Sequence, residues 1–216
     1  MSFTTNEDLA ARLAARLDPL SGSPRPTRNE FAGGPNPALA RPEEEGGVRA
    51  LTPAAVLAPI VKRPEGWTVL LTKRTESMPT HAGQTAFPGG RVQPEDGGPV
   101  ETALRETLEE IGLHPRYIEP LGRTESYETG TGYEIVPIVA YVAPGFSLTL
   151  DEREVDSAFE IPVAFLFDPA NHIRREGEFR GVKRSFYEMV HGERRVWGAT
   201  AGMIRILYER LYEEEA

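Results

Sequence analysis

The chain has 216 residues, a formal net charge of −9 and no cysteine. Its length suits one packed domain, or one domain with a short appendage. The negative charge argues against nucleic-acid or anionic-membrane binding, which needs a basic patch, but it leaves phosphate substrates open. The lack of cysteine excludes disulfides, thiolate metal sites and cysteine nucleophiles. No apolar run has the length of a membrane span and no signal-peptide region is seen, so a cytoplasmic protein is expected.

The first 47 residues are expected to differ from the rest. Residues 6–17 are predicted to form an amphipathic helix with Leu9, Leu13 and Leu17 on one face. Residues 19–47 are rich in Pro, Gly and acidic residues, which indicates a linker or an arm packed over the domain. We therefore divide the chain at residue 47 into a helix with its arm (1–47) and a domain (48–216). The leucine face needs cover from this domain or from a partner subunit, which leaves a homodimer possible.

Most of the domain is expected to consist of strands around one helix. Helices are predicted over residues 99–112 and 200–214 by the spacing of their apolar residues. Strands are predicted at 54–61, 67–72, 117–127, 133–142, 157–161, 172–178, 184–190 and 194–197. A helix between strands, with a second helix at the end, indicates an α/β (α+β) fold, an α/β/α sandwich on a mixed β-sheet.

The helix predicted over residues 99–112 has an acidic face. Its period of 3.6 residues places Glu106, Glu109 and Glu110 together. Like charges near a helix C-terminus cost up to about 1 kcal/mol each, and they suit a hard divalent cation that prefers oxygen ligands. The apolar residues of the segment fall on the opposite face and are predicted to pack into the core: Val100, Leu104, Leu108 and Ile111.

The pattern around this helix resembles the Nudix box, G-x5-E-x7-R-E-U-x-E-E-x-G-U, in which U is a bulky apolar residue. Asp96 stands where Glu is usual, the next gap is eight residues rather than seven, and Thr107 takes an apolar position. The resemblance implies a Nudix-type sandwich and an enzyme that cleaves a nucleoside diphosphate linked to another group. The matching residues are Gly90, Arg105, Glu106, Glu109, Glu110, Gly112 and Leu113.

The resemblance also implies roles for the acidic residues. Glu106 and Glu110 are expected to be the main ligands of Mg²⁺ or Mn²⁺, with Glu109 completing the set directly or through water. Arg105 is expected to orient Glu109. Gly89 can bring its backbone carbonyl close to the metal because no Cβ obstructs it.

The general base of the reaction is left open at this stage. Nudix enzymes often recruit it from a glutamate outside the box, which makes Glu128 and Glu160 candidates. Both could equally be solvated charges.

The segment directly before the box is similar to a motif of the coenzyme A pyrophosphatase branch, LLTxR followed by RxxxGxxxFPGG. Pro79 stands where the second arginine is expected. Arg74 is predicted to hold a substrate phosphate, and Lys73 to face the other way because strand side chains alternate. His81 and Gln84 are predicted to contact substrate from the same loop. The residues that agree are Leu70, Leu71, Thr72, Arg74, Gly83 and Phe87 to Gly90.

Three functions are compatible with these patterns. The favoured one is metal-dependent hydrolysis of coenzyme A or its derivatives to 4′-phosphopantetheine and adenosine 3′,5′-bisphosphate. The second is a Nudix pyrophosphatase for ADP-ribose, a dinucleotide or an oxidised nucleotide. The third is a non-catalytic ligand sensor, which the intact set of three glutamates disfavours. The expected partner is a small nucleotide of the coenzyme A class.

Overall fold

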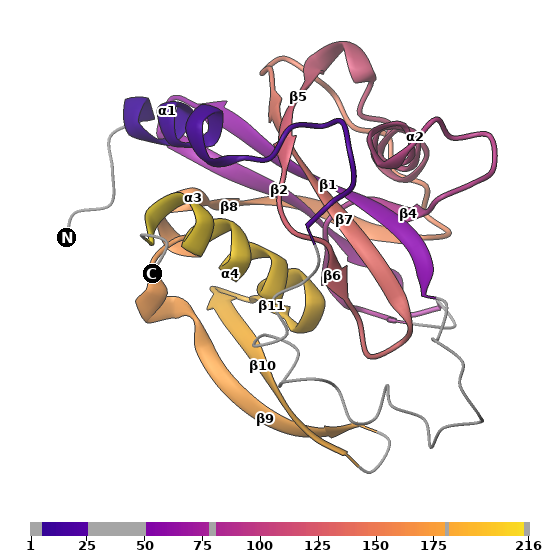
Figure 1. Cartoon of the computed structure of the whole chain (residues 1–216), viewed down its shortest axis with the longest axis vertical. Helices are drawn as coiled ribbons and strands as arrows, with labels where there is room; N and C mark the ends of the chain where they lie inside the picture. Colours follow the sequence, from indigo (N-terminus) through magenta and orange to yellow (C-terminus); the bar gives the residue numbers. More distant parts are fainter. Residues whose placement is uncertain (1–5, 26–50, 78–80, 180–181, 214–216) are drawn as a thin grey trace.

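The computed structural model describes residues 6–25, 51–77, 81–179 and 182–213 (Figure 1). Its helices are α1 (Asn6–Arg16), α2 (Pro99–Ile111), α3 (Val163–Leu166) and α4 (Gly198–Tyr212). Its strands are β1 (Thr52–Arg63), β2 (Gly66–Arg74), β3 (Thr85–Ala86), β4 (Gly89–Arg91), β5 (Ile118–Arg123), β6 (Tyr127–Glu128), β7 (Tyr133–Val142), β8 (Val155–Pro162), β9 (Ile173–Phe179), β10 (Val182–His191) and β11 (Arg194–Trp197). Most of residues 19–47 and Pro79, which carried sequence predictions, lie outside the described residues.

Within the described residues, the strands form an eight-stranded mixed sheet and a three-stranded antiparallel sheet. The large sheet has the order β3-β2-β1-β7-β5, with β4 and β6 paired to β1 and β7, and β8 paired to β2. Only the β1–β7 pair of this sheet is parallel, and it runs over ten residue pairs from Thr52–Tyr133 to Val61–Val142. The long, buried β1 therefore holds together the two halves of the sheet.

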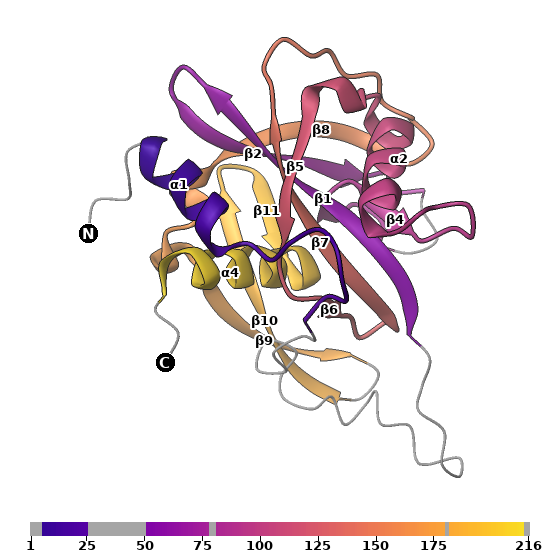
Figure 2. The same cartoon turned by 45° about the horizontal axis from the view of Figure 1, so that its top comes forward.

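Helices cover both faces of the large sheet, so the predicted α/β/α sandwich on a mixed sheet is confirmed (Figure 1). One core lies between the sheet and α2 and includes Leu57, Leu70, Ala103 and Ile138. The other core lies under α1 and α4. Helix α4 also packs on the sheet of β9, β10 and β11 (Figure 2). No helix among the described residues is long and apolar enough to cross a bilayer.

The predicted core face of α2 is partly wrong. Leu108 is 41% exposed, whereas Thr107 and Glu110 are buried. The hydroxyl of Thr107 is satisfied by donating to the carbonyl of Ala103, so it can occupy a place where an apolar residue was expected. The helix is thus rotated to turn Glu110 toward the sheet, and Leu108 moves to solvent as a consequence.

The N-terminal helix docks on its own domain through an apolar face and a buried ionic cluster. Leu9 and Leu13 belong to the same core as α4. The Arg210 guanidinium donates to the Arg16 carbonyl, to Glu125 at 2.8 Å and to Asp18 at 2.5 Å. The leucine face that required cover is therefore covered within one chain.

The ionic cluster predicts a large stability effect for Arg210→Met. Asp18 and Glu125 would lose the partner that they share in a buried environment, which typically costs about 3–5 kcal/mol. Denaturant unfolding should show this loss. The control is Arg175→Met, because Arg175 makes a half-exposed pair with Glu188 and such pairs contribute roughly 0–1 kcal/mol. Equal losses of stability in the two variants would contradict a large contribution of the buried Arg210 cluster.

Candidate active site

The site forms where the last turn of α2 meets the segment that leads from β2 to β4. This segment leaves β2 at Arg74, turns and returns through β3, since the Arg74 amide donates to the Gln84 carbonyl at 3.0 Å. It then adds β4 beside β1, with Gly89 opposite Val56. Arg74 and Gly89, which are distant from α2 in sequence, both reach the carboxylate of Glu110 through this path.

Glu110 is a buried carboxylate with incomplete compensation. It is 4% exposed, and its oxygens accept from the Gly89 amide at 3.2 Å and from Arg74 Nη1 at 3.4 Å. Burial raises the pKa of Glu110 to about 7, although Arg74 acts in the opposite direction. Burial also raises the pKa of Glu106, although its hydrogen bond from Arg105 acts in the opposite direction.

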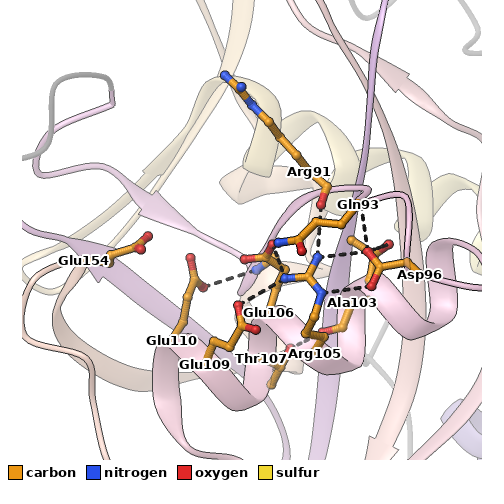
Figure 3. Close-up of polar contacts among 12 residues, drawn as sticks. Arg91, Gln93, Asp96, Ala103, Arg105, Glu106, Thr107, Glu109, Glu110 and Glu154 are labelled. Atoms are coloured by element: carbon orange, nitrogen blue, oxygen red, sulfur yellow. Dashed lines mark hydrogen bonds and ion pairs between the residues drawn. The ribbon is translucent and has the colours of Figure 1, made fainter.

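Arg105 is the rigid centre of the box (Figure 3). Its Nε and Nη2 bind Asp96 in a bidentate pair at 2.9 Å each, and Nη2 also donates to the Arg91 carbonyl. Its Nη1 donates to Glu106 at 2.8 Å and to Glu109 at 3.1 Å. All five N–H donors of the guanidinium are thereby used. Arg105 consequently fixes both glutamates, as the box resemblance implied for Glu109.

Asp96, which stands in place of the usual glutamate, is held equally firmly. Besides Arg105, it accepts from the Thr102 hydroxyl at 2.8 Å and from the Gln93 amide at 2.9 Å. Arg105 holds the pKa of Asp96 well below its usual range. The shorter side chain is therefore compatible with the network that anchors Arg105.

The two glycines that begin β4, Gly89 and Gly90, are required for different reasons. Gly89 has φ +152°, and a Cβ there would lie 2.4 Å from the carbonyl oxygen of Ala55. A Cβ on Gly90 would lie 2.5 Å from the carboxyl carbon of Glu106. Gly89 thus allows the backbone of β4 to approach β1, whereas Gly90 leaves room for the carboxylate of Glu106.

The donor set suits a hard cation, although the carboxylates do not yet converge on one point. Among the residues that the structure describes, no three acidic or histidine side chains are placed to hold an ion. Arg105 occupies oxygens of Glu106 and Glu109, while Arg74 lies beside Glu110. The oxygen chemistry and the undercompensated burial of Glu110 nevertheless fit a divalent cation, which would have to displace arginine contacts.

Glu154 is a further acidic residue of the site that the sequence interpretation missed. Its Oε2 lies 3.7 Å from Arg74 Nη2, and its charge acts on Glu106 and Glu110. The segment that carries it is bonded to the end of α2, because the Asp151 amide donates to the Glu110 carbonyl at 2.9 Å. In Figure 3 the Glu154 side chain lies to the left of Glu110, on the segment that leads into β8. Its position between other acidic residues gave no sequence signal.

The two candidate bases from the sequence are found elsewhere. Glu160 pairs with Arg63 and accepts from the Thr68 hydroxyl. Burial raises its pKa, but these bonds outweigh burial and the pKa is lowered. It lies opposite Leu70, roughly 13 Å along β2 from Arg74. Glu128 lies in β6, which β7 and β1 separate from β2.

Within the described residues, the predicted substrate residues His81 and Gln84 contact each other but none of the box glutamates. His81 Nδ1 and Gln84 Oε1 are 3.0 Å apart, and His81 has a left-handed φ of 59°. Such a conformation is uncommon for a non-glycine residue and is a feature of some binding loops. Lys73 pairs with Asp156 at 3.6 Å, and a register shift of β2 against β8 falls between Lys73 and Arg74.

In this α/β/α sandwich, the acidic last turn of α2 packs against the sheet beside Gly89 of β4. A family model described as "NUDIX domain" matches residues 51–194. The chain is 39% identical over 158 residues to the "Uncharacterized Nudix hydrolase NudL" of Escherichia coli (strain K12), which covers 71% of this chain and 80% of NudL. The chain therefore belongs to the Nudix hydrolases, enzymes that generally use divalent metal ions.

Solved structures show weaker likeness. A MutT/nudix family protein from Enterococcus faecalis has a TM-score of 0.47 at 16% identity, over 78% of this chain and 63% of that one. The NUDIX domain of Shewanella oneidensis NrtR, solved with ADP ribose, has a TM-score of 0.43 at 20% identity, over 60% of this chain and 84% of that one. These values do not bear on the substrate of this chain.

The two glycines predict two separable failures. Gly90→Ala should remain folded but lose roughly a hundredfold in turnover, because the flexible end of Glu106 must move away. Gly89→Ala should instead lower the melting temperature markedly, since the clash is with backbone and φ is unfavourable. Thermal unfolding and steady-state kinetics of both variants separate these effects. Full activity in Gly90→Ala would show that Glu106 needs no such space.

Proposed function

We propose that this enzyme hydrolyses the diphosphate linkage of coenzyme A or its derivatives, releasing 4′-phosphopantetheine and adenosine 3′,5′-bisphosphate. The observation that carries the hydrolytic part is the buried Glu110, which meets Gly89 and Arg74 at the end of the box helix. The similarity of residues 70–90 to the coenzyme A branch motif supports the choice of substrate.

In the proposed reaction, Glu106 and Glu110 are the principal ligands of Mg²⁺ or Mn²⁺, with Glu109 and the Gly89 carbonyl as additional donors. The bound cation would neutralise charge on the diphosphate oxygens and lower the pKa of an attacking water. Arg105 keeps Glu106 and Glu109 oriented through its bonds to Asp96. Placement of the carboxylates before the substrate arrives reduces the reorganisation needed during the reaction.

Arg74, His81 and Gln84 are the proposed contacts to the substrate. Arg74 can offer a fixed charge to a phosphate, and the His81–Gln84 pair can offer hydrogen bonds from the adjoining loop. The 3′-phosphate of coenzyme A carries nearly two negative charges at neutral pH, so a cationic contact would favour it over ADP-ribose.

Glu154 is preferred to Glu128 and Glu160 as the general base in this proposal. Its carboxylate is half-exposed and lies close enough to Arg74 to interact, whereas Glu160 is engaged in a close ion pair with Arg63. Water would lose a proton to Glu154 as its oxygen attacks phosphorus, and the phosphoanhydride P–O bond would break to release the second phosphate monoester. Glu128 remains a less favoured alternative.

A substrate panel tests the proposed function. Coenzyme A should have a higher kcat/KM than dephospho-coenzyme A, ADP-ribose, dinucleotides and oxidised nucleotides, because it alone combines the diphosphate with the 3′-phosphate. Glu110→Gln should lower turnover on every substrate by several orders of magnitude, whereas Glu101→Gln on the same helix should not. Faster cleavage of ADP-ribose than of coenzyme A would refute the branch and leave the pyrophosphatase assignment intact.

The assignment of the base is tested by comparing Glu154→Gln with Glu160→Gln. Loss of a general base typically lowers kcat about 10²–10⁴-fold, and we expect this only for Glu154→Gln. The acidic limb of its log kcat against pH profile should also disappear, an effect that a structural role would not produce. A normal pH profile in Glu154→Gln would exclude it as the base.

A further inference from the structure

Two arginines flank the acidic cluster, and they are bonded very differently. Arg105 uses every N–H donor at distances between 2.8 and 3.1 Å. Arg74 makes one long hydrogen bond of 3.4 Å to Glu110, and its approach to Glu154 is 3.7 Å. Its Nε is buried and has no hydrogen-bond partner within the part of the chain that is described. Arg74 is thus held by charge rather than by a completed set of hydrogen bonds.

The backbone of Arg74 is fixed even though its side chain is not. Its amide donates to Gln84, and it pairs with Val155 at a register shift between β2 and β8. The next amide, that of Thr75, donates to the Glu154 carbonyl at 3.0 Å. Any rearrangement therefore involves the Arg74 side chain alone, which is 19% exposed and ends between the carboxylates of Glu110 and Glu154.

We propose that Arg74 is a built-in counter-ion that competes with the divalent cation for Glu110 and becomes available to a substrate phosphate when the cation binds. This inference rests on the proposed metal site. Glu110 is 4% exposed, and Arg74 Nη1, which lies 3.4 Å from its Oε1, is the cation that the structure places beside it. A divalent ion at the Glu110 oxygens would repel the guanidinium and take its partner.

The exchange couples the two ligands of the enzyme. Once Glu110 binds the cation, Arg74 keeps only the distant contact to Glu154 and has donors free for a phosphate. Since coupling between binding sites is reciprocal, a bound diphosphate that engages Arg74 should in turn strengthen cation binding. Arg74 therefore has opposite effects on the two ligands: it weakens the cation alone and strengthens the diphosphate.

The test measures Mn²⁺ binding by calorimetry without substrate, at pH 8.5, where protons compete least for the carboxylates. Arg74→Met should bind Mn²⁺ roughly three- to tenfold more tightly than the wild type, because the competing charge is gone. Lys73→Met is the matched control: it removes a cation one residue away that pairs with Glu76 and Asp156. Its Mn²⁺ affinity should be unchanged, and Arg74→Lys should lie near the wild type.

The second readout is KM at saturating Mn²⁺. Arg74→Met should raise KM for coenzyme A by on the order of tenfold, the reverse of its effect on the metal. If coenzyme A is not cleaved, ADP-ribose serves as the substrate. The inference then requires the same pair of effects in Arg74→Met, tighter Mn²⁺ binding and a higher KM. Unchanged or weaker Mn²⁺ binding by folded Arg74→Met would overturn it, as would equal tightening in Lys73→Met. A wild type that binds no Mn²⁺ would remove the metal site and this inference together.

Discussion

The arrangement of the site follows from one unfavourable fact, the burial of the Glu110 carboxylate against the sheet. A charged group in that position must be neutralised, hydrogen-bonded or protonated. Among the described residues, one amide and one long arginine contact meet this carboxylate, and burial raises the pKa of Glu110 to about 7. The proposed cation at this site would complete the contacts that Glu110 lacks.

The arginines around Glu110 differ in how firmly they are held. Arg105 and Asp96 form a saturated network that fixes Glu106 and Glu109, so these carboxylates are positioned by the protein. Arg74 lies on the other side of Glu110 with incomplete bonding and can yield its place. This difference would serve the proposed exchange, in which Arg74 leaves Glu110 to the cation and turns to a substrate phosphate.

Helical and strand periodicity predicted most of the architecture, including the strand Tyr133–Val142 with its bounds. The prediction that Leu108 lies in the core was wrong. Periodicity assigns apolar residues to the buried face of a helix, and it could not indicate that Glu110 is the residue turned toward the sheet. The motif identified the box glutamates from local spacing. The contacts of Arg74 and the presence of Glu154 depend on how β2, α2 and β8 come together, and only the folded structure contains that information.

The most direct test of the central claim is a crystal structure of the enzyme with Mn²⁺, located by its anomalous scattering. We expect the ion about 2.1–2.3 Å from an oxygen of Glu110, together with Glu106, and the Arg74 guanidinium withdrawn from Glu110. An ion bound elsewhere, with the Arg74–Glu110 contact preserved, would contradict the account.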